Sequence, residues 1–510
     1  MKNTKALAHP KETELKLTLP TSDASQLLER LSKTRTLAKR AAVHLNLHNI
    51  YFDTPAQHLR QARIALRLRH VDNDHRGEGH WLQTLKMGGQ SDSALSQRGE
   101  WEVPVPGPQL SWDALQDTPW VEFDPSGELF SSLNPCFTTR FKRVSWVIRQ
   151  RDGTQIEVSL DLGDILLGTK TAPICELELE LLAGQADVLF SVALALSGSL
   201  PVLPLNASKS ERGYNLAKDG AALATCARPP VLNARMRINV AAQTVLREMF
   251  GQFTANLYHL LAANEPEAVH QARIGWRRFK SALRLFKPVL NPQARPSKQD
   301  LQAVLMSLGA LRNLNVARFD TLPALADAYR AGDTIKAQHW QAMTKAMDGA
   351  ARQELFKLRA ALQAPAVGTC LLQMTQWLED LSDPNKTQTT VVKLPESLAK
   401  FAQRRTGRLA HQLQHSVQSG GLDHVHQIRL LAKRLRYNVE SLRALLPKKL
   451  SRAEHQKALQ LQVQIGTQRD VNQAVELLIQ LGAAPELLTF VRGYALGLSQ
   501  TGVADSITPK

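Results

Sequence analysis

Apolar and polar residues alternate with a period of two along much of the first 218 residues of this chain. Because successive side chains of a strand point to opposite faces, such alternation predicts strands. Gly, Asp or Pro residues separate many of these stretches. The alternating stretches are 11–19, 64–71, 80–87, 98–105, 139–150, 154–165 and 174–182. Helical periodicity is confined to a few interspersed segments, such as 24–33 and 185–198. Many alternating strands with few helices predict an α+β domain with an antiparallel sheet that is closed or nearly closed.

The pattern changes after residues 218–235. From there Leu, Ala, Gln, Arg and Lys dominate, and apolar residues recur at intervals of three and four. This periodicity predicts amphipathic helices and an all-α domain. A stretch rich in polar residues and Pro, 381–397, divides the helical region near its middle.

The two parts of the helical region resemble each other. His270-Gln-Ala-Arg273 in the first part matches His426-Gln-Ile-Arg429 in the second, and each is followed at the same spacing by two further basic residues. The stretch 305–317 parallels 461–474 in the same way. These echoes indicate an internal duplication of a helical unit. The expected organisation is a strand-rich domain over 1–218, a linker over 219–235, and a helical domain over 236–510 with repeats at about 236–380 and 395–510.

Charged residues form rows on single faces of the expected strands. Glu12, Glu14 and Lys16 share one face, and the later row Glu176, Glu178 and Glu180 is wholly acidic. Like charges in one row repel one another unless an opposite charge lies among them. A divalent cation with oxygen ligands would neutralise acidic rows, and Arg and Lys rows would hold phosphate oxygens. The rows therefore suggest a site for a metal-bound polyphosphate, with a barrel that has a charged exterior as the alternative.

The charged rows of the other expected strands are basic, acidic or mixed. Arg67 and Arg69 share a face in one strand, and Glu157, Ser159 and Asp161 share a face in another. The remaining rows are Lys86; Arg98, Glu100 and Glu102; and Arg140 with Lys142, while Arg143 lies on the opposite face of that strand.

Composition narrows the class of protein and of partner. The chain has 510 residues, 43% of them hydrophobic and 21% charged, which is typical of a globular protein with two or three domains. Its formal net charge of +17 favours anionic partners. The 4 cysteines form no CxxC or Cys/His cluster, which argues against zinc and a disulfide framework. With no secretory signal and no long apolar span visible, we expect a cytoplasmic protein without membrane segments.

The segment Glu12-Thr-Glu14-Leu-Lys16 resembles the ExExK signature of the CYTH family, the triphosphate tunnel metalloenzymes. Further motifs follow in the family's order, and the resemblance covers nearly all of residues 10–218. These motifs are 51–54, 65–69, 81–86, 98–102, 140–143, 156–163, 175–181 and 208–214. The resemblance implies an eight-stranded antiparallel tunnel that hydrolyses or cyclises triphosphates with Mg²⁺ or Mn²⁺.

The resemblance also implies roles for single residues. The metal ligands would be Glu12, Glu14, Glu176 and Glu178. The phosphate-binding residues would be Lys16, Arg67, Arg69, Lys86, Arg140 and Lys209. Lys16 would also take part in catalysis, and Glu157 and Asp161 would support the metal or orient water. Glu180 fits the acidic row equally well, and no general base is assigned.

The helical region presents two basic faces. On a helix, offsets of 0, 3, 7 and 8 lie within one broad face, so the residues of each His motif converge. The two sets are His270, Arg273, Arg277 and Arg278, and His426, Arg429, Lys433 and Arg434. Facing one another across a groove, they would repel without an anion between them. A solvated basic surface is the alternative.

These motifs resemble the CHAD domain over about 235–500, a family associated with polyphosphate binding. The first repeat departs from the family, because Arg312-Asn-Leu-Asn315 stands where an acidic stretch is common, whereas the second keeps Arg469 and Asp470. Few aromatic residues accompany the basic motifs, which argues against nucleic acid.

The pair of resemblances suggests an inorganic triphosphatase that cleaves tripolyphosphate to pyrophosphate and phosphate, with a helical domain that binds polyphosphate. Three alternatives stay open. These are hydrolysis of an organic triphosphate such as thiamine triphosphate or a nucleotide, an adenylate cyclase activity, and polyphosphate binding without turnover.

Overall fold

The computed structural model describes residues 11–19, 24–72, 79–90, 93–217, 224–383, 386, 397–419 and 422–502. Its contacts divide the chain into two units. The first comprises Met1–Leu223 and Leu362–Gln376, and the second comprises Ala224–Ala361 and Trp377–Lys510. The start of the expected linker, 219–223, and most of the expected break at 381–397 lie outside the described residues. No helix within the described ranges is both long and apolar enough to cross a membrane.

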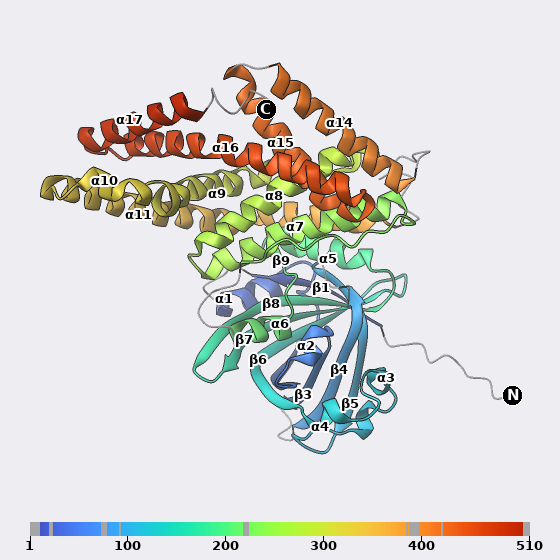
Figure 1. Ribbon diagram of the computed structural model, residues 1–510. Coiled ribbons are helices and arrows are strands. Elements are labelled where there is room, and N and C mark those ends of the chain that lie inside the picture. The colour runs from blue at the N-terminus through green and yellow to red at the C-terminus, as the bar shows by residue number, and fades with distance from the viewer. Residues whose placement is uncertain are drawn as a thin grey trace. The chain divides into compact units, whose positions relative to one another are not determined.

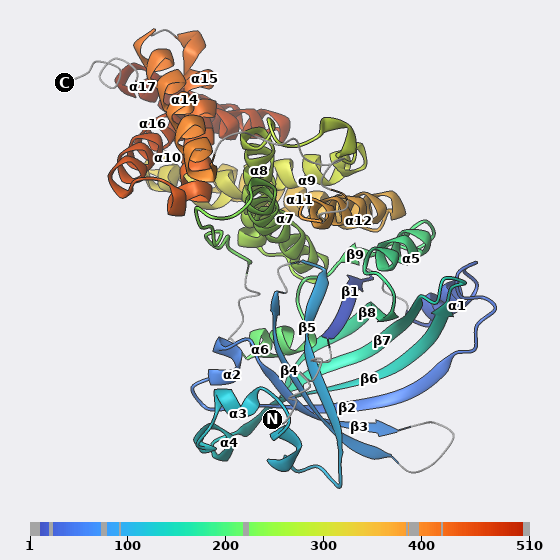
Figure 2. The same ribbon diagram turned by 90° about the vertical axis from the view of Figure 1, so that its right-hand side faces the viewer.

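The first unit is built on a closed antiparallel barrel (Figure 2). Its strands are β1 (Lys11–Thr18), β2 (Val43–Asp53), β3 (Ala65–Asp72), β4 (His80–Gln90), β5 (Leu95–Val105), β6 (Asn134–Arg149), β7 (Gln155–Leu167), β8 (Lys170–Ala183) and the short β9 (Leu203–Pro204). The strands run in the order β5-β4-β3-β2-β6-β7-β8-β1, and pairing of β1 with β5 closes the ring of eight. This confirms the closed sheet that the alternating pattern predicts.

Short helices accompany the barrel. They are α1 (Ala24–Ser32), α2 (His58–Gln61), η1 (Asp113–Leu115), α3 (Trp120–Phe123), α4 (Glu128–Ser131), α5 (Asp187–Ser197) and α6 (Lys209–Leu216). A large apolar core lies outside the barrel wall. Leu15 and Leu17 of β1 and Leu177 of β8 are fully buried there, together with Leu31 of α1 and Leu189 of α5. Because these strands bury their apolar face outward, their charged face points into the barrel.

A segment distant in sequence completes this core. Leu372 of α12 (Pro365–Asp380) is fully buried in the same cluster as the strand leucines. The Thr369 hydroxyl lies 2.9 Å from the Ser197 hydroxyl of α5. A Cβ atom at Gly368 would lie 2.0 Å from the carbonyl oxygen of Val202, so only glycine permits this close approach. Residues 362–376 are therefore part of the first unit's packing.

The second unit is helical, as predicted (Figure 1). Its main helices are α7 (Ile238–Ala262), α8 (Pro266–Leu285), α9 (Gln302–Asn315), α10 (Ala326–Arg330), α11 (Thr334–Leu362), α14 (Leu398–Gln418), α15 (Leu422–Leu442), α16 (Lys448–Gln480) and α17 (Pro485–Gly502). Between them lie the short 3-10 helices η2 (Pro292–Ala294), η3 (Gln299–Leu301), η5 (Pro323–Leu325) and η6 (Arg443–Leu445) and the π-helix η4 (Val316–Thr321). The two His motifs fall on α8 and α15, which pack against each other, and α9 packs against α16.

Candidate active site

The barrel encloses a charged cavity of about 460 Å³. Among the described residues, seven cations and six carboxylates line it. The cations are Lys16, Arg67, Arg69, Lys86, Arg98, Arg143 and Lys209, and the carboxylates are Glu12, Glu100, Glu102, Glu157, Glu178 and Glu180. Most of the charged rows of the sequence therefore face one another across an interior, and the alternative of a charged exterior is wrong for the rows that line the cavity.

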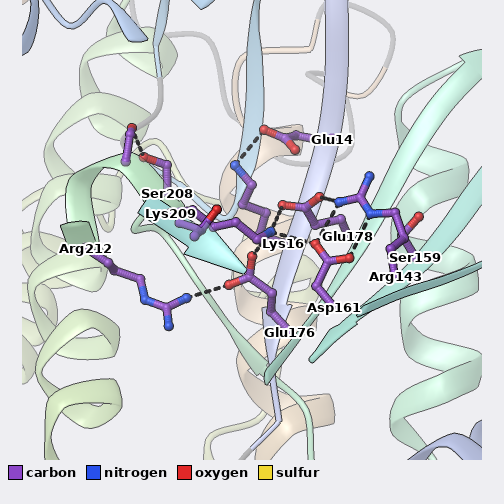
Figure 3. Close-up of polar contacts among 12 residues, drawn as sticks. Glu14, Lys16, Arg143, Ser159, Asp161, Glu176, Glu178, Ser208, Lys209 and Arg212 are labelled. Carbon is purple, nitrogen blue, oxygen red and sulfur yellow. Dashed lines mark hydrogen bonds and ion pairs between the residues drawn. The ribbon is translucent and has the colours of Figure 1, made fainter. Parts of the chain in front are cut away.

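Lys209 holds together the acidic side of the cavity (Figure 3). It is the first residue of α6, and the Ser208 hydroxyl caps that helix by accepting a hydrogen bond from the Glu211 amide. The Lys209 ammonium donates to Asp161 Oδ2 at 2.7 Å and to Glu178 Oε1 at 2.9 Å, and also pairs with Glu176. Burial alone would lower the pKa of Lys209, but the three carboxylates raise it above its ordinary value. Lys209 is therefore firmly protonated.

Arg143 joins two of the same carboxylates from the neighbouring strand (Figure 3). Its guanidinium donates to both oxygens of Asp161, at 2.7 Å each, and to Glu178 Oε2 at 2.5 Å. Burial would raise the pKa of Glu178, but Lys209 and Arg143 lower it well below its usual value. Both oxygens of Glu178 thus accept charge-assisted hydrogen bonds.

A second network ties β1 to β4 and β5. Glu12 accepts from Lys86 at 2.8 Å and from Arg98 at 3.0 Å. Glu14 accepts from Arg98 at 2.7 Å and pairs with Lys16 at 2.7 Å. The two acids of the ExExK motif are therefore bound to cations within the barrel wall, and its lysine is paired with one of these acids.

A third group lies on β3 and β5. Arg67 is 3.7 Å from Glu100, and Arg69 is 3.6 Å from Glu102. Burial and the charge of Arg67 lower the pKa of Arg69 to about 10. The Tyr51 hydroxyl accepts a long hydrogen bond of 3.4 Å from Arg67. Burial would raise the pKa of Tyr51, but Arg67, together with nearby lysine and arginine charges, lowers it. A guanidinium group whose pKa is lowered by a neighbouring guanidinium favours the approach of an anion.

Three carboxylates come close enough to share a metal ion. Oxygen atoms of Asp161, Glu176 and Glu178 all lie within 4.8 Å of one another. A set of hard oxygen donors suits Mg²⁺ or Mn²⁺. The structure thus brings Glu176 and Glu178 together, as expected, but with Asp161 as the third member. Glu12 and Glu14 lie outside this group, in the network with Arg98.

One phosphate-binding expectation falls on the wrong face of its strand. Arg140 is exposed and does not line the cavity, because Thr139, Phe141 and Arg143 are the inward residues of β6. Arg143 is therefore the cation that this strand contributes. The other expected phosphate ligands line the cavity, and Arg98 and Tyr51 join them. Arg98 was visible as part of a charged row, whereas Tyr51 lies in the motif at 51–54 and carries no charge that would mark it as a ligand.

The remaining acids differ in their surroundings. Glu157 lines the cavity and accepts a hydrogen bond of 2.9 Å from Ser159. Burial and the charges of Glu12 and Glu100 raise the pKa of Glu180 to about 7. Carboxylates therefore crowd one side of the cavity beyond what the local cations neutralise.

The second unit gathers cations from four helices, which we call the basic cluster: Arg273 and Arg277 of α8, Arg312 of α9, Arg429 and Lys433 of α15, and Arg469 of α16. Burial and the charges of Arg277, Arg429 and Arg469 lower the pKa of Lys433 to about 7. Burial and Arg277 likewise lower the pKa of Arg273. Such mutual repulsion means that the two repeats bring like charges together.

Not all residues of the two His motifs join the basic cluster. Arg278 is buried and lies 3.6 Å from Glu440, so its partner is a carboxylate within the fold. Burial and Arg284 lower the pKa of Arg434, which places Arg434 beside a different arginine. His426 is exposed, whereas burial and Arg312 lower the pKa of His270 at the edge of the cluster. Sequence reasoning noted Arg312 and Arg469 but did not count them as anion ligands.

Comparison with known proteins gives two family matches. Residues 10–214 match the family model described as the CYTH domain, and residues 244–479 match the one described as the CHAD domain. A curated relative from Haemophilus influenzae, named inorganic triphosphatase, is 32% identical over 206 residues, which cover 40% of this chain and 54% of the relative. The chain thus spans about half the length of that relative.

Solved structures align with each part separately. The CHAD domain from the plant Ricinus communis is 24% identical and covers 56% of this chain and 94% of its own length, with a TM-score of 0.47. A protein from Hippeastrum, described as an adenylyl cyclase with a dominant triphosphatase activity, is 20% identical. It covers 40% of this chain and 95% of its own, with a TM-score of 0.30. The two family matches follow one another along the sequence, and the chain therefore belongs to the CYTH family through its first domain and to the CHAD family through its second.

Proposed function

We propose that the barrel hydrolyses inorganic triphosphate to pyrophosphate and phosphate with the help of a divalent cation. The observation that carries the proposal is the enclosed cavity in which basic and acidic rows face one another. Binding an anion alone requires only the cations. The carboxylates beside them fit a substrate that arrives with a metal ion.

The cations and carboxylates that are paired in the cavity could each pair with a ligand group instead. Lys209 and Arg143 now neutralise Asp161 and Glu178. A bound triphosphate would offer its oxygens to these cations, and a metal ion would offer its charge to the carboxylates. Each buried charge would then keep a partner in both states, and no charge would be left uncompensated.

The metal would be held by Asp161, Glu176 and Glu178, whose oxygens already lie together. When bound, Mg²⁺ or Mn²⁺ supplies Lewis-acid polarisation of phosphate oxygens and a more acidic bound water. The residues of the chain bind and orient the phosphates through Lys16, Arg67 and Lys209. Glu157 lines the same cavity, accepts a hydrogen bond from Ser159 and would orient water. Positioning and charge stabilisation make up most of the catalysis of phosphoryl transfer.

The choice of inorganic triphosphate rests on the relative that carries this name. The test is phosphate release by the purified full chain from tripolyphosphate, thiamine triphosphate and ATP, each with Mg²⁺ and with Mn²⁺. We expect the highest kcat/KM for tripolyphosphate, with pyrophosphate and phosphate as products. Preference for an organic triphosphate, formation of cyclic AMP from ATP, or binding without turnover would each favour the corresponding alternative.

The helical domain is proposed to bind polyphosphate at the basic cluster. Six cations from four helices repel one another, and a linear polyanion would relieve this repulsion. The test is binding of long-chain polyphosphate by the full chain and by Arg277→Gln, in competition with DNA at one salt concentration. We expect weaker polyphosphate binding in the variant. A preference of the wild type for DNA would favour a nucleic-acid partner instead.

A further inference from the structure

The Lys209 ammonium lies among the three carboxylates that could share a metal ion (Figure 3). It contacts one oxygen of each of them: Oδ2 of Asp161 at 2.7 Å, Oε1 of Glu178 at 2.9 Å, and Oε1 of Glu176. Oxygens of these three residues also lie within 4.8 Å of one another. A cation that contacts three converging carboxylate oxygens stands where a divalent ion with oxygen ligands would bind.

Two guanidinium groups hold the same carboxylates from other directions. Arg143 donates to Oδ1 of Asp161 at 2.7 Å and to Oε2 of Glu178 at 2.5 Å. Arg212 donates to Oε2 of Glu176 at 2.6 Å. These bonds orient each carboxylate independently of the lysine. If the ammonium left, the three oxygens that it contacts would remain close together with no cation among them.

The ammonium can move without a movement of its helix. Lys209 is the first residue of α6, and the Tyr214 hydroxyl of the same helix donates to Oδ2 of Asp53, at the end of β2, at 2.8 Å. This buried bond anchors α6 to the barrel. The unbranched stem of a lysine allows its ammonium to change partners while the backbone stays in place. Lys209 lines the cavity, so phosphate oxygens bound there would lie within its reach.

An ammonium and a divalent cation cannot share this position, because two positive charges a few ångströms apart repel strongly in a buried site. A metal ion must therefore displace the Lys209 ammonium before it can take all three oxygens. Without a phosphate in the cavity, the displaced ammonium would lose these three carboxylate partners, which is costly for a buried charge. A bound triphosphate would supply new oxygens and remove this cost.

We propose that Lys209 is a tethered competitor of the divalent cation, which keeps the three carboxylates closed to free metal ions until a triphosphate takes over its ammonium. The proposal rests on the proposed triphosphatase function and adds an order of binding to it: the metal ion enters with the triphosphate or after it. Substrate and metal then bind cooperatively, because each removes the partner that the other must replace. Free divalent ions do not fill the site in the absence of substrate.

The test is the binding of Mn²⁺ alone to the purified full chain without phosphate, measured by calorimetry and by the paramagnetic resonance of free Mn²⁺. We expect Lys209→Met to bind Mn²⁺ at least about tenfold more tightly than the wild type, because the competing charge is gone. Mn²⁺ should also raise the Tm of this variant more than that of the wild type. Lys209→Gln, whose amide still donates to one carboxylate, should show the same changes if the methionine variant does not fold.

Lys142→Met is the matched control. It removes an ammonium from the same barrel, but Lys142 is exposed on the outer face of β6, where solvent screens its charge. Its affinity for Mn²⁺ should stay within about twofold of the wild type. Unchanged Mn²⁺ affinity in the folded Lys209 variants, or an equal gain in the control, would overturn the inference alone. Failure of the wild type to cleave tripolyphosphate with either metal would instead overturn the proposed function on which it rests.

Discussion

Replacing Arg143 with methionine removes a guanidinium group from the cavity and keeps a side chain of similar length. Arg140→Met makes the same replacement three residues earlier, on the exposed face of the same strand. The pair therefore separates the loss of an inward charge from the loss of an arginine on β6.

The magnitude follows from the contacts of Arg143. It makes three hydrogen bonds of 2.5–2.7 Å to Asp161 and Glu178, and Asp161 is fully buried. Removing one partner of a buried ion pair costs roughly 3–5 kcal/mol. Lys209 continues to neutralise both carboxylates, so we expect the lower end, about 3 kcal/mol, for Arg143→Met. Arg140→Met should change stability by less than about 0.5 kcal/mol.

The effect on activity should be larger than the effect on stability. Loss of one preorganised donor to a reacting oxygen lowers kcat by roughly 10²–10³-fold. We therefore expect Arg143→Met to lower kcat/KM for tripolyphosphate by at least about a hundredfold at a temperature where the variant is folded. Arg140→Met should stay within about twofold of the wild type.

Phosphate release with Mg²⁺ and urea unfolding of both variants provide the measurement. If Arg143→Met kept the activity of the wild type, Arg143 would have no role in binding phosphate. If Arg140→Met lost as much activity as Arg143→Met, the inward and outward faces of β6 would be assigned wrongly.

Three further predictions concern other parts of the chain. Anion binding should raise the lowered pKa of Lys433 again. Polyphosphate affinity should therefore be highest below pH 7 and fall as the pH rises from about 7. Binding titrations should show this fall in the wild type and a smaller one in Lys433→Arg. Glu178→Gln should raise the Mg²⁺ concentration needed for half-maximal phosphate release at least about tenfold, whereas Glu29→Gln on the exposed helix α1 should not. Leu372→Ala should destabilise the first unit by about 2–5 kcal/mol in thermal unfolding, because Leu372 is fully buried in the barrel's outer core.

The alternation of charges in the sequence carries most of the information about the barrel. The row Glu12, Glu14 and Lys16 lies inward as a set, and so does the row Glu176 and Glu178, because one register fixes every second residue. The segment 140–143 is different, since it carries cations on both faces. The inward face is decided there by Val144 and Trp146, which pack into the outer core and force Arg143 to the inside.

Long-range packing explains what the sequence could not show. Leu372 lies more than 150 residues after the last strand, and its helical periodicity is that of any amphipathic helix. Its burial against the barrel depends on the close approach at Gly368, which no local pattern marks. The separation of Arg278 from the basic cluster is similar, because it depends on Glu440 of another helix.

The buried ion pairs inside the barrel contribute little net stability to the fold, and this is the strongest indication that they serve a function. Buried ion pairs seldom stabilise a protein more than well-packed apolar residues of the same volume. The apolar core that does stabilise this unit lies outside the strands, under α1 and α5. Charges such as Lys209 and Asp161 therefore fit the proposed ligand site better than a role in stability. The proposed ligand, an anionic substrate with its metal ion, carries both signs and would use the whole set, whereas an anion alone would need only the cations and not Asp161, Glu176 and Glu178.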